Sequence, residues 1–162
     1  MARPIFDEEL HQLRSDVIEM AEFAKEAIEG SFDAVRQVSA TKAYLVASND
    51  SLIDGKEREI ESLCLRLLLR EQPVASDLRS VTAALKLITD LERIGDQAFD
   101  ISDITKHVSF QKYESKVHIK EMANAVIYMV TDSVDSYVKK DAALAKKVAA
   151  ADDQVDDLFL PV

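Results

Sequence analysis

The chain has 162 residues, of which 48% are hydrophobic and 31% charged, and its formal net charge is -10 at pH 7. This composition suits one soluble domain or two small ones, and the apolar stretches are far shorter than the roughly 20 residues of a membrane-spanning helix. The acidic balance argues against nucleic-acid binding, because the basic residues form no stripe that could neutralise phosphates. Only three Gly and three Pro occur, so we expect long helices and an all-α fold.

The first of three long helices is predicted over residues 7–38. Apolar residues recur there at alternating steps of three and four from Leu10 onward, which is the spacing of one helical face. Ser39 can then cap a second helix over residues 40–71, and Pro73 prevents that helix from continuing.

A third helix is predicted over residues 77–108, with Ser76 or Asp77 as its N-cap. Short turns between three long helices indicate an antiparallel bundle, which we place at residues 1–110. The single cysteine, Cys64, falls on an apolar seam of this bundle, where a small buried side chain is a better interpretation than a reactive thiol.

Residues 111–162 repeat the beginning of the chain. A shift of 102 residues gives 11 identities over the 46 ungapped positions 15–60, concentrated on the helical seam and on two pairs of aspartates. The repeat predicts a second bundle with its first two helices only. Two helices cannot bury an apolar face alone, so we expect either a fragment or a second bundle that another chain completes, for example in a swapped dimer. The repeated aspartates include Asp50 and Asp54, which fall on Asp152 and Asp156.

Acidic side chains stack at steps of four on the second and third helices. Residues four apart share one face of a helix. Because the two helices are antiparallel around Pro73, residues whose numbers sum to about 146 should lie level, which pairs Asp50 with Asp96 and Asp54 with Glu92. One acidic patch is therefore predicted from six residues: Asp50, Asp54, Glu57, Glu92, Asp96 and Asp100.

A cation is the simplest partner for such a patch. Two like charges about 4 Å apart repel by roughly 4 kcal/mol at an effective dielectric of about 20. A solvated acidic face is the alternative interpretation, but Asp50, Glu57 and Glu92 interrupt apolar seams, and Gly95 suggests close approach of another group. Oxygen ligands favour Mg, Mn, Ca or ferric iron over Zn. Asp152 and Asp156 are candidate ligands of a second, incomplete cluster.

Other chemistry has little support in the sequence. The segment Glu8-x-x-His11 has the spacing of half a di-iron carboxylate site, but a complete site needs a second such motif and further glutamates. We find no glycine-rich phosphate loop and no arrangement typical of a Ser or Cys nucleophile. An enzyme is therefore not expected.

Four segments carry a resemblance to a known family. They are FDEEL at 6–10, Asp50-x-x-Ile-Asp54 followed by Glu61-x-x-Cys64, QPVASDLR at 72–79 and LERIGDQA at 91–98. In these segments, and over the whole chain, the sequence resembles the PhoU family of phosphate-signalling regulators. The resemblance implies tandem three-helix bundles and, in some members, multinuclear metal clusters at paired E(D)-x-x-x-D motifs. The matching residues here are Asp50, Asp54, Glu92 and Asp96, with Asp100 as a neighbour.

The resemblance also implies a regulatory role. It suggests restraint of phosphate uptake and of two-component signalling through contact with the ATPase subunit of a phosphate ABC transporter and with a phosphate-sensing histidine kinase. A homodimer would be usual, in the cytoplasm and at the inner membrane face through these partners, with no insertion into the membrane. The alternatives are an accessory regulator of a secondary phosphate permease and a carboxylate-ligated metal-binding protein. The chain departs from the family pattern in lacking a second ERIGD-like helix.

Overall fold

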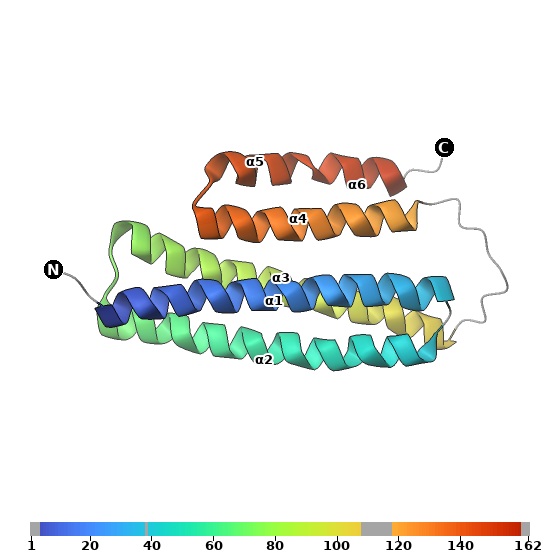
Figure 1. Cartoon of the computed structure of the whole chain (residues 1–162), viewed down its shortest axis with the longest axis horizontal. Coiled ribbons are helices and arrows are strands. Elements are labelled where there is room, and N and C mark those ends of the chain that lie inside the picture. Colours follow the sequence, from blue (N-terminus) through green and yellow to red (C-terminus); the bar gives the residue numbers. More distant parts are fainter. Residues whose placement is uncertain (1–3, 38, 108–117, 160–162) are drawn as a thin grey trace.

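A computed structural model describes residues 4–37, 39–107 and 118–159, and every regular element in these ranges is a helix (Figure 1). The all-α prediction is therefore confirmed. Three long helices are followed by one of intermediate length and two short ones: α1 (Pro4–Gln37), α2 (Ala40–Glu71), α3 (Ala75–His107), α4 (Ile119–Lys139), α5 (Ala142–Ala150) and α6 (Asp152–Phe159).

The bounds of α2 are those that the sequence predicts. The Ser39 hydroxyl accepts a hydrogen bond from the backbone N–H of Lys42 at 3.4 Å, as an N-cap does. The prediction for the start of α3 was wrong: Ser76 and Asp77 lie within its first turn and do not cap it, because the helix already begins at Ala75. The predicted last residues of the first and third helices, 38 and 108, lie outside the described residues.

The helices α1, α2 and α3 form a bundle around one hydrophobic core (Figure 1). Burying one large apolar side chain contributes about 1.5–3 kcal/mol, so the repeated seam positions hold the bundle together. On α3 the buried face includes Leu91, whereas Leu78 in its first turn is 40% exposed. The largest side chains of the core come from all three helices: Leu13, Met20, Ile53, Ile60, Leu67 and Ile88.

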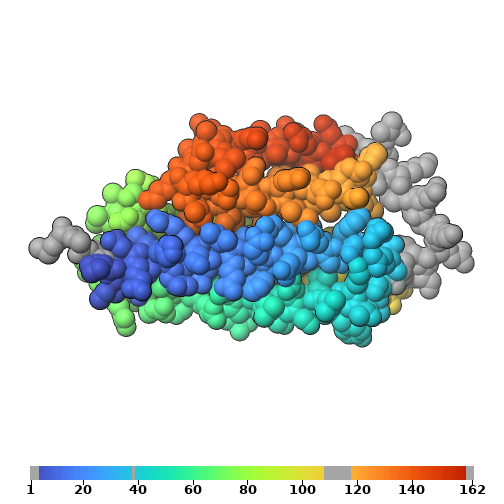
Figure 2. Space-filling model, in the orientation of Figure 1, coloured from blue at the N-terminus to red at the C-terminus, as the bar shows by residue number. Residues whose placement is uncertain are grey.

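The second repeat lies along the bundle. In Figure 1, α4 runs beside α1, and α5 and α6 lie on the outer side of α4. The space-filling view shows the same order, with α4 between α1 and the C-terminal helices (Figure 2). Shifted by 102 residues, the end of α1 falls on the end of α4, and the start of α2 falls on the start of α5. The caps correspond too, because Asp141 accepts from the backbone N–H groups of Ala143 and Leu144 where the first repeat has Ser39.

One difference separates the two repeats. The counterpart of α2 is not one continuous helix as the repeat predicts, because it is interrupted at Ala151 between α5 and α6. At the equivalent position of α2, the Asn49 side chain donates to the Phe23 carbonyl oxygen of α1 at 3.2 Å. The methyl group of Ala151 cannot make such a bond to α4.

The second repeat shares the core of the first. Val130 and Val134 of α4 are buried in the same cluster as the bundle residues, and Tyr137 and Val138 pack against it. The division at residue 110 into two domains stays a prediction. Among the described helices, none combines the length and the apolar character needed to cross a membrane.

Candidate metal centre

The bundle brings α2 and α3 close together at Gly95. A Cβ atom added to Gly95 would lie 2.7 Å from the Cδ1 atom of Ile53. Such a distance is too short for any larger side chain unless Ile53 moves, so the glycine permits the close approach. Asp54 and Asp96 directly follow these two residues in the sequence. The contact between the two helices therefore sets the position of the acidic side chains.

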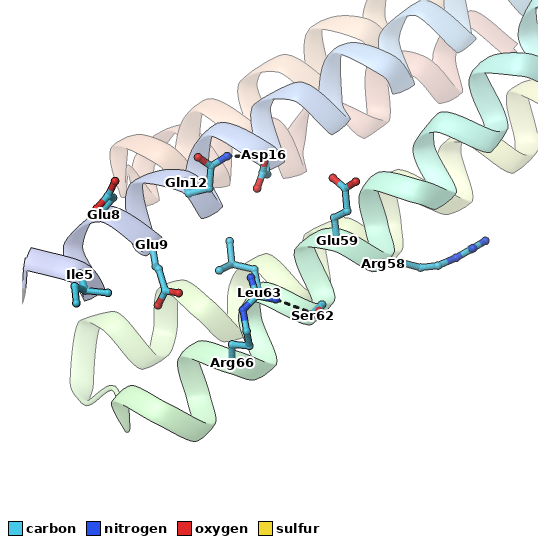
Figure 3. Close-up of a pocket in the computed structure, with 10 residues that line it drawn as sticks. All are labelled: Ile5, Glu8, Glu9, Gln12, Asp16, Arg58, Glu59, Ser62, Leu63 and Arg66. Carbon is cyan, nitrogen blue, oxygen red and sulfur yellow. Dashed lines mark hydrogen bonds between the residues drawn. The ribbon is translucent and has the colours of Figure 1, made fainter.

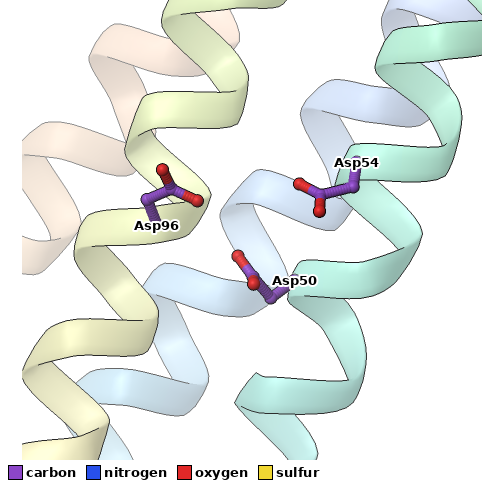
Figure 4. Close-up of side chains that lie close together, drawn as sticks. All are labelled: Asp50, Asp54 and Asp96. Atoms are coloured by element: carbon purple, nitrogen blue, oxygen red, sulfur yellow. The ribbon is translucent and has the colours of Figure 1, made fainter.

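Three of the predicted carboxylates meet at this point. Asp50 and Asp54, one turn apart on α2, point toward Asp96 on α3 (Figure 4). Each offers one oxygen atom, and these three atoms lie within 4.8 Å of one another. Asp50 and Asp54 are half-buried and Asp96 is exposed. The level pairing of Asp50 with Asp96, which followed from residue numbers, is confirmed by this grouping.

The electrostatics of the cluster disfavour three negative charges. Partial burial raises the pKa of Asp50 above its ordinary value, and the charges of Asp54, Asp96 and Asp100 raise it further. The only basic group paired with these carboxylates in the described structure is Arg58, whose Nη2 atom lies 3.8 Å from Asp54 Oδ2 on the exposed surface. One buried oxygen, Asp50 Oδ1, has no hydrogen-bond partner there.

An unsatisfied buried carboxylate oxygen is costly and indicates a missing partner. Oxygen donors at this spacing fit a hard divalent or trivalent cation, which takes several carboxylate oxygens at once. Asp50, Asp54 and Asp96 could therefore hold one metal ion.

Three further predicted residues border the cluster. Burial first, and then the charges of Glu61, Asp54 and Asp96, raise the pKa of Glu57. Burial followed by the charges of Asp96 and Glu57 likewise raises the pKa of Glu92. Asp100 acts on the pKa of Asp50. These residues extend the negative field, but the group whose oxygens could share one ion contains none of them.

The predicted pair of the second repeat does not join the cluster. Asp152, at the start of α6, lines a cavity opposite Asp90 of α3, and Asp156 is exposed. Within the described ranges, no third acidic, His or Cys side chain comes close enough to either to complete a group of three. The reason is topological. Among the described residues, the second repeat has no counterpart of α3 that could supply the remaining carboxylates.

A polar cleft of about 660 Å³ lies elsewhere, between α1 and α2 (Figure 3). Glu8 lines it, but neither Glu8 nor His11 belongs to a metal-binding group among the described residues. Near this cleft, Lys56 lies 3.4 Å from Asp16 and 2.6 Å from Glu19 across the two helices. The hydrogen bond to Glu19 is the main cause of the raised pKa of Lys56. Lys56 thus offsets part of the negative charge beside this cleft.

Cys64 plays no part in the candidate centre. It is fully buried, as predicted, and burial raises the pKa of its thiol to about 11. The predicted acidic patch does not include Glu61, which stands one helical turn after Glu57 and adds to the negative field around it. The signal was present in the i, i+4 spacing of these two residues.

Comparison with known proteins extends over almost the whole chain. The family model described as the PhoU domain matches residues 17–105 and 119–162. A PhoU homolog of Clostridium acetobutylicum, named as an accessory protein of the phosphate-specific transport system, is 36% identical over 98% of this chain and 74% of its own length. A similarly named homolog of Aquifex aeolicus is 37% identical over 93% of this chain and 69% of its own length.

Solved structures give the same result. The crystal structure of the regulatory protein PhoU from Streptococcus pneumoniae superposes with a TM-score of 0.84 at 28% identity, over 94% of this chain and 72% of that one. PhoU from Pseudomonas aeruginosa gives a TM-score of 0.82 at 31% identity, over 94% and 74%. From the paired carboxylates to the repeated helices, this chain belongs to the PhoU domain family.

Proposed function

We propose that this protein is a non-enzymatic accessory regulator of a phosphate transport system. The supporting observation is its family membership over both repeats, together with curated relatives that are named as accessory proteins of phosphate-specific transport. Regulation by contact suits a molecule built of long exposed helices. The proposed partners are the ATPase subunit of a phosphate ABC transporter and a phosphate-sensing histidine kinase, which the protein meets in the cytoplasm, as a homodimer, at the inner membrane face.

The test is direct binding to purified partners. The chain is immobilised, and the ATPase subunit and the cytoplasmic part of the kinase from the same organism are passed over it separately. Saturable binding of either partner supports the proposal. Binding of neither, combined with capture of a secondary phosphate permease from phosphate-replete cells, would favour the alternative role as a permease regulator.

We further propose that Asp50, Asp54 and Asp96 bind a hard cation, with Glu57, Glu92 and Asp100 adjusting the field around it. The grouping of three oxygens within 4.8 Å and the unpartnered Asp50 Oδ1 support this site. A bound cation would neutralise the cluster and link α2 to α3. The identity of the ion among Mg, Mn, Ca, Fe and Zn follows from measurement, with the oxygen donors favouring ions other than Zn.

Metal content is measured by mass spectrometry on protein purified without a metal-affinity column. We expect at least one ion per chain in the wild type and its loss in the double variant Glu92→Ala, Asp96→Ala. The matched control is Asp152→Ala, Asp156→Ala, which removes two carboxylates from the second repeat and should leave the metal content unchanged. Equal metal content in the wild type and in the first double variant would refute the site.

A further inference from the structure

The helix α2 has an outer face on the side of the molecule opposite α4, α5 and α6 (Figure 1). Steps of three, four and seven residues join Tyr44, Ser48, Gly55, Ser62 and Leu69 into one stripe on the side of α2 away from its buried residues. We call this stripe, with the exposed side chains beside it, the α2 face. It belongs to the first repeat alone.

The α2 face is rich in apolar side chains. Among the described helices, α2 exposes the largest number of large apolar residues, each between 49 and 79% exposed: Tyr44, Leu45, Leu52, Leu65 and Leu69. Single exposed apolar residues are common, but a group of them along one helix is typical of a contact surface. A helix with apolar residues on its inner and its outer side is normally covered on both.

Gly55 lies in the middle of this face. Glycine destabilises a helix relative to alanine, so a helical glycine usually has a packing reason. Gly30 and Gly95 have such a reason, because an added Cβ atom would lie 2.8 Å from Val46 in one case and 2.7 Å from Ile53 in the other. At Gly55 no atom of another described element lies within 4 Å of an added Cβ atom. Because Gly55 stands at the midpoint of the 32 residues of α2, another backbone could approach there most closely.

A second copy of α2 suits this face. In an antiparallel pair with a two-fold axis at Gly55, the two helices overlap along their whole length, and residues whose numbers sum to about 110 lie level. Ser48 then faces Ser62 of the second copy, two small side chains that permit close packing. Tyr44 faces Arg66 of the second copy, an aromatic ring opposite a guanidinium group.

The charges of the α2 face favour the antiparallel arrangement. They belong to Arg58, Glu59 and Arg66, and each of these stands level with an uncharged residue of the second copy. Arg58 also comes within two residues of the level of Asp54, which has the opposite charge. In a parallel pair around a two-fold axis, each charged residue would instead face its own copy and be repelled.

The available area suits a reversible dimer. The 32 residues of α2 extend over about 48 Å at 1.5 Å per residue. A strip about 10 Å wide along this length on each copy gives about 1,000 Å² in total, the lower limit of specific interfaces. Contact over the whole length requires a shallow crossing angle of about 20°.

We propose that the α2 face binds a second copy of this chain, as an antiparallel pair of α2 helices around a two-fold axis at Gly55. The apolar side chains of the face supply the buried surface, Gly55 allows the two backbones to approach, and the charges fix the orientation. This inference rests on the homodimer of the proposed function and names its interface.

Sedimentation equilibrium of the whole 162-residue chain and two variants tests the interface. Gly55→Glu places a carboxylate on the two-fold axis, in space that is open in the single chain. Ala143→Glu is the matched control, since it adds the same charge to an exposed position of α5, on the opposite side of the molecule (Figure 1). We expect the wild type to dimerise, Gly55→Glu to dimerise at least about tenfold more weakly, and Ala143→Glu to behave as the wild type. Circular dichroism checks that both variants keep the fold.

Disulfide cross-linking tests the orientation. Within one chain, Ser48 and Ser62 are about 21 Å apart along α2, and in the antiparallel pair the two copies of either position are equally far apart along the axis. The double variant Ser48→Cys, Ser62→Cys should therefore form a covalent dimer on mild oxidation, and neither single variant should do so. The native thiol of Cys64 is fully buried and will not interfere. A covalent dimer from either single variant, or none from the double variant, would refute the antiparallel arrangement.

The outcomes separate this inference from the proposal on which it rests. A wild type that stays monomeric up to about 0.1 mM would overturn both the homodimer and its interface. A dimer that Gly55→Glu leaves as strong as in the wild type would keep the homodimer and overturn the assignment of the α2 face. A monomeric wild type that binds the transporter ATPase, combined with loss of that binding in Gly55→Glu, would assign the face to the ATPase and overturn the second copy as its occupant.

Discussion

Replacing Asp50 by Asn should stabilise the metal-free protein. The three oxygens of the cluster lie within 4.8 Å of one another. At the 4.8 Å limit, two unit charges repel by about 0.9 kcal/mol in water and by about 3.5 kcal/mol at an effective dielectric of about 20. Asp96 is exposed and Asp54 half-buried, so the value for water is the better guide. Asp50 meets two such neighbours, and its neutralisation should therefore raise the free energy of unfolding by about 2 kcal/mol.

The gain should depend on pH in a defined direction. The folded-state pKa of Asp50 is raised above the ordinary value of 3.8, so the folded protein binds the proton more tightly than the unfolded chain does. Below pH 3.8 the Asp50 carboxyl is protonated in the folded and the unfolded chain, so repulsion does not lower the free energy of unfolding of the wild type. This free energy falls as the pH rises through the raised pKa, and it stays lower at higher pH. The advantage of Asp50→Asn should be complete at pH 7 and should vanish as the pH approaches 3.8.

The assay is thermal unfolding in EDTA, followed by circular dichroism. A gain of about 2 kcal/mol corresponds to a rise of about 4–8 °C in Tm for a chain of this size. Asp90→Asn is the matched control, because it removes an exposed carboxylate of α3 that does not act on the pKa of Asp50. Added Mn²⁺ should raise the Tm of the wild type and not that of Asp50→Asn. A variant no more stable than the wild type in EDTA at pH 7 would refute the reasoning.

Three further predictions concern packing, charge and reactivity. Gly95→Val should lower the free energy of unfolding by about 1–3 kcal/mol through overpacking, and Ile53→Val in the same chain should restore part of it, which a double-mutant cycle in urea measures. Lys56→Met should cost about 1–2 kcal/mol, because it leaves the carboxylates around a side chain only 14% exposed without their cation, whereas Lys139→Met, at 62% exposure, should stay within about 0.5 kcal/mol of the wild type. Cys64 should react with a thiol reagent only as fast as the protein unfolds, and rapid labelling of the native protein would contradict its burial.

Local signals explain which parts of the fold were predictable. The bounds of α2 followed from the cap at Ser39 and the block at Pro73, both of which act within a few residues. The sequence predicts the start of α3 two residues too late, because Ser76 and Asp77 are both good capping residues, although they lie inside the helix. The break at Ala151 has no Gly or Pro to announce it.

The candidate site was predictable for a similar reason. Because α2 and α3 are antiparallel around Pro73, residues equally far from this turn lie level with one another. The sequence therefore predicts that Asp50, Asp54 and Asp96 lie close together, as they do. The repeat predicts a second cluster at Asp152 and Asp156, but among the described residues these two side chains belong to no group of three possible ligands. A metal site of this kind needs carboxylates from a facing helix as well as a pair four residues apart on one helix. The packing of α4 against the first bundle likewise depends on contacts between distant segments, which single-sequence periodicity cannot specify.

The contact between Gly95 and Ile53 has a consequence for how the acidic cluster responds to its surroundings. The two helices approach each other closely beside the carboxylates, because Gly95 leaves no space between its backbone and the Ile53 side chain. Protons or cations can relieve the repulsion, whereas a change of helix spacing cannot do so without breaking the core. Uptake of protons or of a cation would therefore change the charge of this part of the surface without a change in the separation of α2 and α3 at Gly95. Any partner that touches it would respond to ionic conditions through electrostatics alone.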